Sequence, residues 1–170
     1  MAETFANYLV GFFEGKIPEE LIIFLISMLP IVELRGGMIA ASLLNVGLLE
    51  AFIICYIGNI LPIPFILLFI RKIFEFLKRF GFTRKIVEKL EASSMRKSEK
   101  VKKNSKWGLF TFVAIPLPGT GGWTGALIAA LLDMRIKTSF PIIALGVFAA
   151  NVIMSLFSYG LLDMIIGFFK

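Results

Sequence analysis

The sequence predicts an all-α polytopic membrane protein made of two units in an inverted repeat, and three observations predict it. First, the 170-residue chain is 58% hydrophobic and has a mean hydropathy of +0.86, well above that of soluble domains. Second, two apolar segments, 21–49 and 107–132, break near their middle at polar or Gly/Pro residues. Third, residues 51–70 and 138–162 carry no charge and are long enough to span a bilayer. Each unit is therefore expected to join a re-entrant, broken helical hairpin to one full transmembrane helix.

The two broken segments are expected to dip into the membrane and return. Each half holds about 10–14 apolar residues, whereas a crossing needs about 20. We expect half-helices at Leu21–Val32 and Met38–Leu49 in the first hairpin, and at Trp107–Leu117 and Trp123–Leu132 in the second. Short, interrupted apolar segments at matching positions of two halves indicate a transport site near the bilayer midplane. The alternative is that each broken segment crosses fully as one kinked helix.

One integral membrane domain, residues 1–170, is predicted. It divides into repeat 1 at 18–72, a basic amphipathic linker at 73–106 and repeat 2 at 107–170. Apolar side chains at helical spacing also predict an interfacial helix within residues 2–15.

The linker is expected to lie on the cytoplasmic face of the plasma membrane. Residues 71–106 hold 13 Lys/Arg against 4 Asp/Glu, whereas the rest of the chain holds 5 against 8. The positive-inside rule accounts for this better than a nucleic-acid site, because the basic stretch lies between membrane segments. Its apolar spacing predicts two amphipathic helices on the anionic inner leaflet, separated at Gly81, with a hinge at Ser93–Ser94. The first hairpin then enters from outside and the second from inside, so the repeat is inverted.

The repeat is visible in the sequence itself. When Pro30–Gly58 is placed without gaps on Pro118–Gly146, eight of 29 positions are identical, and Asn45 falls on Asp133. Two apolar sequences share many identical residues by composition alone. The repeat is therefore argued also from the order of elements, since a broken hairpin, a polar corner and a long span follow one another in both halves.

The composition argues against an enzyme. Histidine is absent, which removes the commonest general base and metal ligand, and Cys55 is the single cysteine, within an apolar run. We therefore expect no catalytic residue, no metal site, no cofactor and no nucleic-acid partner. The expected partners are membrane lipids, an anionic lipid or small amphiphile as substrate, and other copies of the chain in a homo-oligomer.

The break in the first hairpin holds the only charges between residues 21 and 49. These are Glu33 and Arg35, followed by Gly36 and Gly37. A charge at membrane depth costs about 2.5–3.5 kcal/mol on insertion scales, so it usually faces a cavity or a partner. One interpretation is that Arg35 binds an anion while Glu33 tunes Arg35 or carries a proton. The other is that both residues cap a shallow loop at the surface.

The break in the second hairpin is rich in glycine and proline. Pro116 and Pro118 are expected to end the incoming half-helix, because proline lacks the amide hydrogen. The glycines that follow, with the Thr120 hydroxyl, place a helix N-terminus at mid-membrane, and such termini bind phosphate or carboxylate. Trp123 either packs beside the tip or contacts the substrate. The expected site residues here are Pro116, Pro118, Gly119, Thr120, Gly121, Gly122 and Trp123.

The motifs PIVELRGG (Pro30–Gly37) and IPLPGTGGWTGA (Ile115–Ala126) resemble those of the small multidrug export protein family. That family resembles the wider DedA/VTT superfamily, whose members have two opposed re-entrant hairpins. The resemblance implies membrane transport: drug export by the family's label, or movement of polyprenyl-phosphate carriers and phospholipids by analogy with DedA-like proteins.

Three hypotheses for the function follow. A translocator of an anionic amphiphile, such as undecaprenyl phosphate or a phospholipid, would use Arg35 and the helix N-termini. An exporter of cationic drugs would use Glu33 as the buried carboxylate, coupled to protons or sodium. A non-transporting membrane assembly factor would use the basic linker to bind partners.

Overall fold

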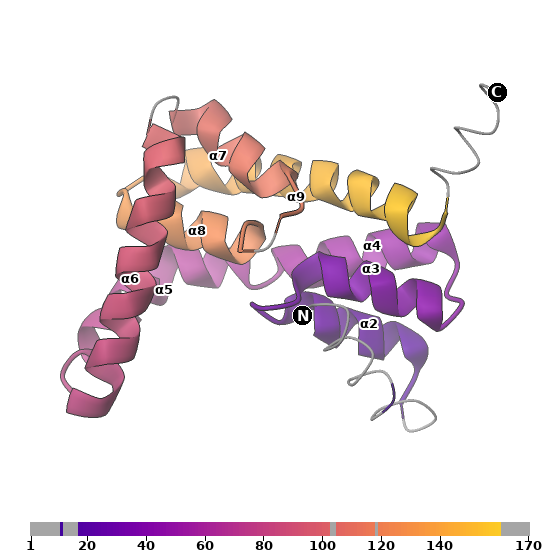
Figure 1. Cartoon of the computed structure of the whole chain (residues 1–170), viewed down its shortest axis with the longest axis horizontal. Coiled ribbons are helices and arrows are strands. Elements are labelled where there is room, and N and C mark those ends of the chain that lie inside the picture. Colours follow the sequence, from indigo (N-terminus) through magenta and orange to yellow (C-terminus); the bar gives the residue numbers. More distant parts are fainter. Residues whose placement is uncertain (1–10, 12–16, 103–104, 118, 161–170) are drawn as a thin grey trace. The chain divides into compact units, whose positions relative to one another are not determined.

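The computed structural model describes residues 11, 17–102, 105–117 and 119–160, and those in secondary structure are all helical. The helix predicted within residues 2–15, the candidate site residue Pro118 and the C-terminal residues 161–170 lie outside the described residues. The helices are α2 (Glu19–Met28), α3 (Glu33–Leu43), α4 (Leu48–Ile60), α5 (Ile63–Leu77), α6 (Gly81–Lys102), α7 (Ser105–Ala114), α8 (Gly122–Leu131) and α9 (Ile136–Ser158) (Figure 1).

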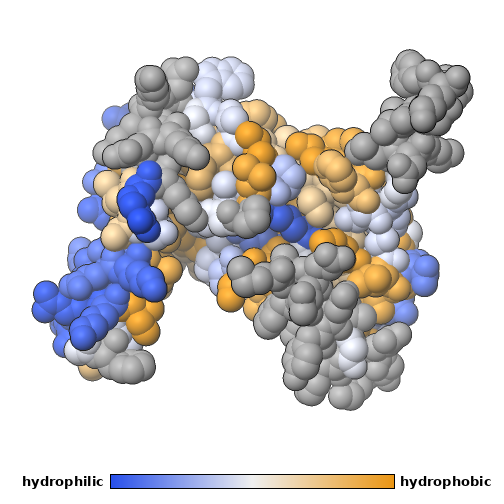
Figure 2. All heavy atoms as spheres, in the orientation of Figure 1, coloured by the Kyte–Doolittle hydropathy of each residue, from blue (hydrophilic) through white to orange (hydrophobic). Residues whose placement is uncertain are grey.

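Among the described residues, two stretches of helix are long and apolar enough to cross a membrane: Leu48–Leu77, which comprises α4 and α5, and Ile136–Ser158, which is α9. Only 39% and 33% of their most apolar windows are buried inside the chain. Large side chains such as Phe65, Leu145 and Phe157 are more than half exposed, and orange, hydrophobic surface is plain in Figure 2. A soluble core helix would be mostly covered, so these exposed apolar surfaces fit helices that face lipid.

The chain divides into two compact units, residues 1–61 with 147–170, and residues 62–146. Each long apolar stretch therefore starts in one unit and ends in the other. In the first stretch the division falls at Leu61–Pro62, where the helix is interrupted as the prolines predict. In the second it falls after Gly146, within α9.

The first unit packs α2, α3 and α4 together around buried Ile22, Ile23 and Met38. The second part of α9 runs antiparallel to α4. The Asn151 side-chain amide donates to the Phe52 carbonyl at 2.8 Å, and the ring of Phe148 meets that of Phe52 edge-on, with ring centres 5.4 Å apart.

The second unit packs α5, α6, α7, α8 and the first part of α9. Its core includes Ile63, Leu109 and Ile128, each fully buried. An exposed ion pair joins Arg71, near the end of α5, to Asp133, in the corner between α8 and α9. The end of α5 and this corner therefore lie together.

The same backbone corner occurs in both units, 88 residues apart. Leu44, after α3, has φ −84° and ψ 3°, and Leu132, after α8, has φ −86° and ψ 8°. Asn45 and Asp133 follow with φ 58° and 54°. The next amide then closes the corner, Val46 to Ala41 and Met134 to Ala129, each at 3.0 Å. The predicted match of Asn45 with Asp133 is thus a match of conformation.

The helices that precede the two tips, α2 and α7, correspond to each other at a different offset, of 86 residues. A Cβ added at Gly58 would lie 2.9 Å from the Phe24 carbonyl and 3.1 Å from Ser27, and one at Gly146 would lie 3.2 Å from the Phe110 carbonyl and 2.8 Å from Val113. Phe24 and Ser27 therefore correspond to Phe110 and Val113. The second tip is two residues longer, so Pro30 corresponds to Pro116 rather than to Pro118, and the gap-free alignment was wrong at this point.

The first hairpin breaks earlier than predicted. Its break is Leu29–Val32, and Glu33, Arg35, Gly36 and Gly37 lie inside α3 instead of on an extended tip. The reason is Pro30, which disfavours a helical conformation at Leu29 and leaves that residue extended, with ψ 135°. The predicted half-helix Leu21–Val32 corresponds to α2, which already ends at Met28. The predicted half-helix Met38–Leu49 corresponds to α3, which begins earlier, at Glu33, and ends at Leu43.

The linker also differs from its prediction. Its first apolar residues, up to Leu77, continue α5, and a single helix, α6, covers Gly81–Lys102. The break at Gly81 is confirmed, but Ser93–Ser94 is not a hinge, because Ser94 is buried within a continuous helix that packs on α7 and α8. The predicted division at Gly81 therefore holds, and the predicted hinge within the second helix is wrong.

Candidate functional site

The first tip is a sharp connection between two half-helices. The Leu29 amide donates back to the Ile26 carbonyl at 3.1 Å, and the Glu33 amide donates to the Leu29 carbonyl at 2.9 Å. Val32 is buried and precedes α3, while Ile31 is 79% exposed. Gly36 lies directly against the Val32 side chain, where an added Cβ would clash. This packing explains why the predicted site residue Gly36 is a glycine, without giving it contact with a ligand.

Glu33 and Arg35 occupy the first turn of α3. The Glu33 side chain is only 4% exposed, Arg35 is partly buried, and the carboxylate attracts the guanidinium electrostatically. An i, i+2 pair shares one side of an extended segment, which is the arrangement that a break at these residues predicts, but the structure places both residues at the start of α3 instead. There the positive end of the helix dipole favours the carboxylate.

The second tip connects α7 to α8 through residues 115–121. Gly119 and Gly121 have φ of 76° and 121°, values that only glycine adopts without strain. Gly121 and Gly122 are buried at the start of α8, and the Gly125 amide donates to the Gly121 carbonyl at 2.8 Å. The predicted helix N-terminus is therefore present.

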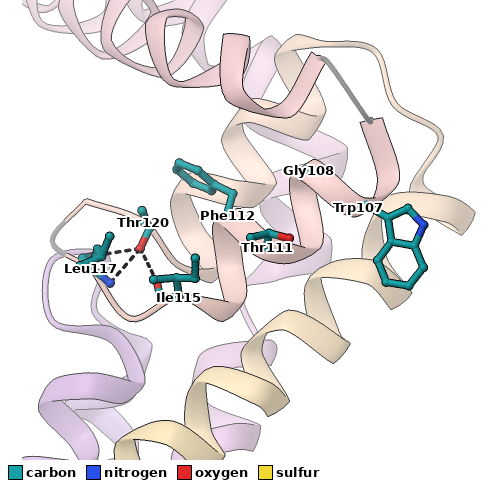
Figure 3. Close-up of a pocket in the computed structure, with 7 residues that line it drawn as sticks. All are labelled: Trp107, Gly108, Thr111, Phe112, Ile115, Leu117 and Thr120. Atoms are coloured by element: carbon teal, nitrogen blue, oxygen red, sulfur yellow. Dashed lines mark hydrogen bonds between the residues drawn. The ribbon is translucent and has the colours of Figure 1, made fainter.

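Thr120 holds this tip together, as Figure 3 shows. Its hydroxyl contacts the carbonyls of Ile115 and Leu117 at 2.8 and 2.7 Å, and the Leu117 amide donates to the hydroxyl oxygen at 3.2 Å. The hydroxyl thus satisfies backbone groups left over by the end of α7. Thr120 was predicted to contact substrate, and its hydrogen bonds assign it first to the loop.

An open cavity of about 380 Å³ lies beside this tip, at the small end of the range for ligand pockets. Most of its lining comes from one face of α7, and the indole of Trp107 stands at the far end from Thr120 (Figure 3). The lining is mainly apolar and includes the hydroxyl groups of Thr111 and Thr120. It consists of Trp107, Gly108, Thr111, Phe112, Ile115, Leu117 and Thr120. Such a surface suits an alkyl or aromatic group.

Trp123 follows the tip in α8 and is partly buried, but does not line this cavity. Pro116, also partly buried, precedes the loop closed by Thr120. The two tips belong to different compact units, so their predicted meeting in one site stays a prediction.

The sequence analysis did not assign the polar residues next to the first tip to the site. Ser27, Cys55 and Asn59 are fully buried in the first unit. The Asn59 side-chain amide donates to the Ser27 carbonyl at 3.2 Å, and Cys55 is hydrogen-bonded to Ser27. A lone asparagine within a long apolar stretch predicts an interhelical hydrogen bond, and for Asn59 the structure confirms it. Its partner at the end of α2 could not be read from spacing, because the break was expected further along the chain.

A comparison with protein-family models matches residues 33–153 to a family described as "Putative small multi-drug export protein". The match covers more than two thirds of the chain. The protein belongs to the small multi-drug export protein family.

The match in this small multi-drug export protein begins at Glu33, so it includes the charged start of α3 and the whole second tip but leaves out α2. Searches of the curated proteins and of the solved structures found no match. Among the described residues of this family member, no group of His, Cys, Asp and Glu is arranged to hold a metal ion.

Proposed function

We propose that this protein moves an amphipathic molecule with an anionic head group across the plasma membrane, such as a polyprenyl phosphate (undecaprenyl phosphate) or a phospholipid. The observation that carries the proposal is the pair of charges at the start of α3. Glu33 is buried and Arg35 is partly buried inside an otherwise apolar hairpin. Charges at membrane depth are unfavourable unless a partner or a cavity compensates them, and they usually mark a substrate or ion path.

Arg35 is the group that would recognise the anion. A guanidinium binds phosphate or carboxylate through a planar set of donors, and it stays charged at all physiological pH values. The second tip adds the positive end of the α8 dipole, framed by Gly119 and Gly121. The apolar cavity along α7 supports an amphiphile, because it offers a surface for a hydrocarbon chain next to that tip.

The proposal includes a multi-pass, inverted topology with two re-entrant hairpins and a cytoplasmic linker. Two contacts support it. The Tyr159 hydroxyl, just past α9, donates to the Val46 carbonyl at the corner of the first unit, and Arg71, near the end of α5, pairs with Asp133 at the corner of the second. Each long apolar stretch thus ends at the corner from which the other begins, so the two hairpins would open towards opposite sides.

A second candidate is a proton-coupled exporter of cationic drugs. The family description names drug export, and Glu33 is the buried carboxylate that such a mechanism requires. A proton or sodium gradient would then drive transport. In either case the protein would need no cofactor and catalyse no reaction. A membrane assembly factor is the third candidate, and it would have no use for these charges.

Ligand binding separates the candidates. Purified protein in lipid nanodiscs would be titrated with dodecyl phosphate and with tetraphenylphosphonium. We expect Arg35→Ala to weaken dodecyl phosphate binding at least about tenfold, as loss of a charge-assisted contact does. Arg79→Ala is the matched control, because Arg79 is an exposed arginine on the connection between α5 and α6, and it should leave the affinity unchanged.

The opposite ligand preference would overturn the proposal. Binding of tetraphenylphosphonium that Glu33→Gln abolishes, with no binding of dodecyl phosphate, would establish the cation exporter. Transport assays in proteoliposomes then test coupling: a Glu33→Gln variant that still binds substrate but ignores the proton gradient identifies Glu33 as the proton carrier. Binding of neither ligand would leave the assembly factor.

A further inference from the structure

The two units provide an internal comparison, because the same helix crossing is built twice with different side chains. The glycines at the crossing correspond, Gly37 with Gly125 and Gly58 with Gly146. Gly37 and Gly58 both lie against Ser27, whereas Gly125 and Gly146 both lie against Val113. Ser27 therefore occupies in the first unit the place that Val113 occupies in the second.

The difference extends to the neighbours of Ser27 on α4. Cys55 and Asn59 correspond, 88 residues on, to Ile143 and Val147 of α9. All of these side chains are fully buried. One copy of the crossing is thus polar and the other apolar, although the corner that follows has the same backbone conformation in both.

The second copy demonstrates that this backbone forms without polar groups at the crossing. The first copy is also the less favourable one, since the Oδ1 atom of Asn59 is buried and accepts no hydrogen bond from the described residues. A buried acceptor without a partner destabilises the folded state, whereas replacing both members of a buried polar pair by apolar groups is close to neutral. Folding alone therefore does not account for Asn59.

What Asn59 does is hold the end of α2. Its amide donates to the carbonyl of Ser27, one residue before α2 ends at Met28, and the Ser27 hydroxyl donates to the Ile23 carbonyl at 2.7 Å. Carbonyl groups in the last turn of a helix have no partner within the helix, so a side chain from α4 supplies one. The chain then turns through Leu29–Val32 directly into Glu33.

The second tip is held in another way, by the Thr120 hydroxyl within its own loop. The first tip has a proline and apolar residues between its half-helices and no such hydroxyl. Its anchoring comes from the adjacent helix instead.

We propose that Asn59 and Ser27 are positioning residues, which fix the end of α2 and through it the placement of Glu33 and Arg35. This inference rests on the proposed role of those two charges in handling substrate. Asn59 acts through the Ser27 carbonyl and the tip backbone, without touching the substrate itself.

The test measures two properties separately: the mobility of the first tip and the affinity for dodecyl phosphate. Cys55→Ala removes the only cysteine, and Ile31→Cys in that background carries a nitroxide at an exposed position of the first tip. Asn59→Val introduces the residue of the second copy. We expect a clearly more mobile nitroxide spectrum and dodecyl phosphate affinity at least about tenfold lower. The thermal midpoint should stay close to that of the parent, because the variant removes one buried acceptor without a described partner, Asn59 Oδ1, and leaves another, the Ser27 carbonyl.

Asn151→Val is the matched control. Asn151 is also buried in the first unit and donates to a backbone carbonyl, that of Phe52, and its Oδ1 accepts no hydrogen bond from the described residues. Its side-chain amide bonds to α4, however, and not to α2. This variant should keep the nitroxide immobile and the affinity unchanged.

Three results would overturn the inference: an unchanged spectrum in Asn59→Val, the same loss in Asn151→Val, or an Asn59→Val protein that fails to fold, since the polar crossing would then serve folding. If the parent protein binds no dodecyl phosphate, the proposed function fails. The nitroxide spectrum still decides whether Asn59 holds the tip.

Discussion

At the scale of single residues, backbone conformation distinguishes Glu33 from its counterparts. Among the described non-glycine residues, Glu33, Asn45 and Asp133 have positive φ, at 53°, 58° and 54°. Asn and Asp tolerate this left-handed region because their short side chains bond locally, but Glu does not. The position that corresponds to Glu33 in the second unit is Gly121, with φ 121°. A strained, buried carboxylate where the other unit has glycine indicates a functional constraint.

Substitutions at Glu33 should reveal this strain. Glu33→Gly and Glu33→Ala both remove the charge, but alanine keeps the Cβ that disfavours positive φ. We expect Glu33→Gly to be more stable than Glu33→Ala by about 1 kcal/mol, measured by unfolding in detergent. Asn45→Gly and Asn45→Ala form the matched pair at an exposed position with the same φ. If the glycine variant were more stable than the alanine variant at Asn45 but not at Glu33, the result would contradict the left-handed conformation of Glu33.

The same residues mark the limit of sequence reasoning. Charges and paired glycines normally interrupt apolar helices, so the break was placed on Glu33–Gly37. In the structure these glycines lie within a helix, because they allow close packing. Gly36 lies against the Val32 side chain, and Gly37 lies against Ser27 and Cys55. Those contacts join residues of different helices or turns, and no local pattern contains them. The second tip was predicted more closely, because its prolines and glycines act through local backbone geometry.

At the scale of helices, each of the two long apolar stretches is bonded at its end to one of the corners, one through a tyrosine hydroxyl and the other through an ion pair. Tyr159 and Arg71 are 88 residues apart and bond to the corners at Val46 and Asp133. Burial raises the pKa of Tyr159 to about 12, so its phenol remains a donor throughout the physiological range. Tyrosine and arginine look unrelated in an alignment, and their equivalence follows only from their contacts.

The ion pair and the tyrosine hydrogen bond should contribute differently to the free energy of unfolding. The Arg71–Asp133 pair is exposed, with half or more of each side chain accessible, so Arg71→Gln should change stability by less than about 1 kcal/mol and the effect should fade with added salt. Tyr159→Phe removes a half-buried hydrogen bond of 2.8 Å and should cost about 1 kcal/mol, independent of salt. Unfolding titrations at low and high salt measure both. A salt-dependent Tyr159→Phe effect would contradict this account.

The helix α6 presents an amphipathic surface of its own. Ile86 and Leu90 are about half exposed, while Arg84 and Glu88, hydrogen-bonded to each other at 2.7 Å, lie roughly opposite them on the helix. Blue, hydrophilic side chains cover much of α6, next to a strip of orange (Figure 2). Exposed apolar residues opposite a charged face are typical of a helix lying in a membrane interface.

Nitroxide labels on α6 test this interfacial placement. Placed at Ile86 or Leu90 in the Cys55→Ala background, a label should be relaxed mainly by oxygen, which concentrates in lipid. At Arg84 or Glu88 it should be relaxed mainly by a water-soluble nickel chelate. Equal accessibility to the chelate at all four positions would place α6 in water and leave the basic residues free for a protein partner.

At the scale of the whole molecule, the correspondence of the two corners is the part of the predicted repeat that the structure supports, while its inverted orientation stays a prediction. Seven of the eight identities, all except Pro30 with Pro118, lie in the part of the alignment that contains the corners, and the corners agree in dihedral angles and hydrogen bonds. The two extra residues of the second tip escaped notice, because apolar half-helices align about equally well at neighbouring registers. The offset became visible only through the close contacts at Gly58 and Gly146.

Topology is the remaining property of the whole molecule, and the corners offer its sharpest test. Asn45 and Asp133 are both exposed and have the same conformation, so cysteines placed there should react at similar intrinsic rates. Asp133 pairs with Arg71, where the basic stretch begins, and positive charge is retained in the cytoplasm. In the Cys55→Ala background, we expect Asp133→Cys to react with a membrane-impermeant maleimide only in inside-out vesicles. Arg96→Cys, an exposed position on α6, should behave in the same way.

Asn45→Cys should react only in intact cells, because one apolar stretch of 30 residues, Leu48–Leu77, separates its corner from Arg71. That length exceeds the roughly 20 residues of a crossing and does not reach the about 40 that two would need. Opposite labelling of two equivalent corners is what an inverted repeat requires. Labelling of both corners from the same side would instead mean that the repeats are parallel, and each broken hairpin would then have to cross the membrane completely.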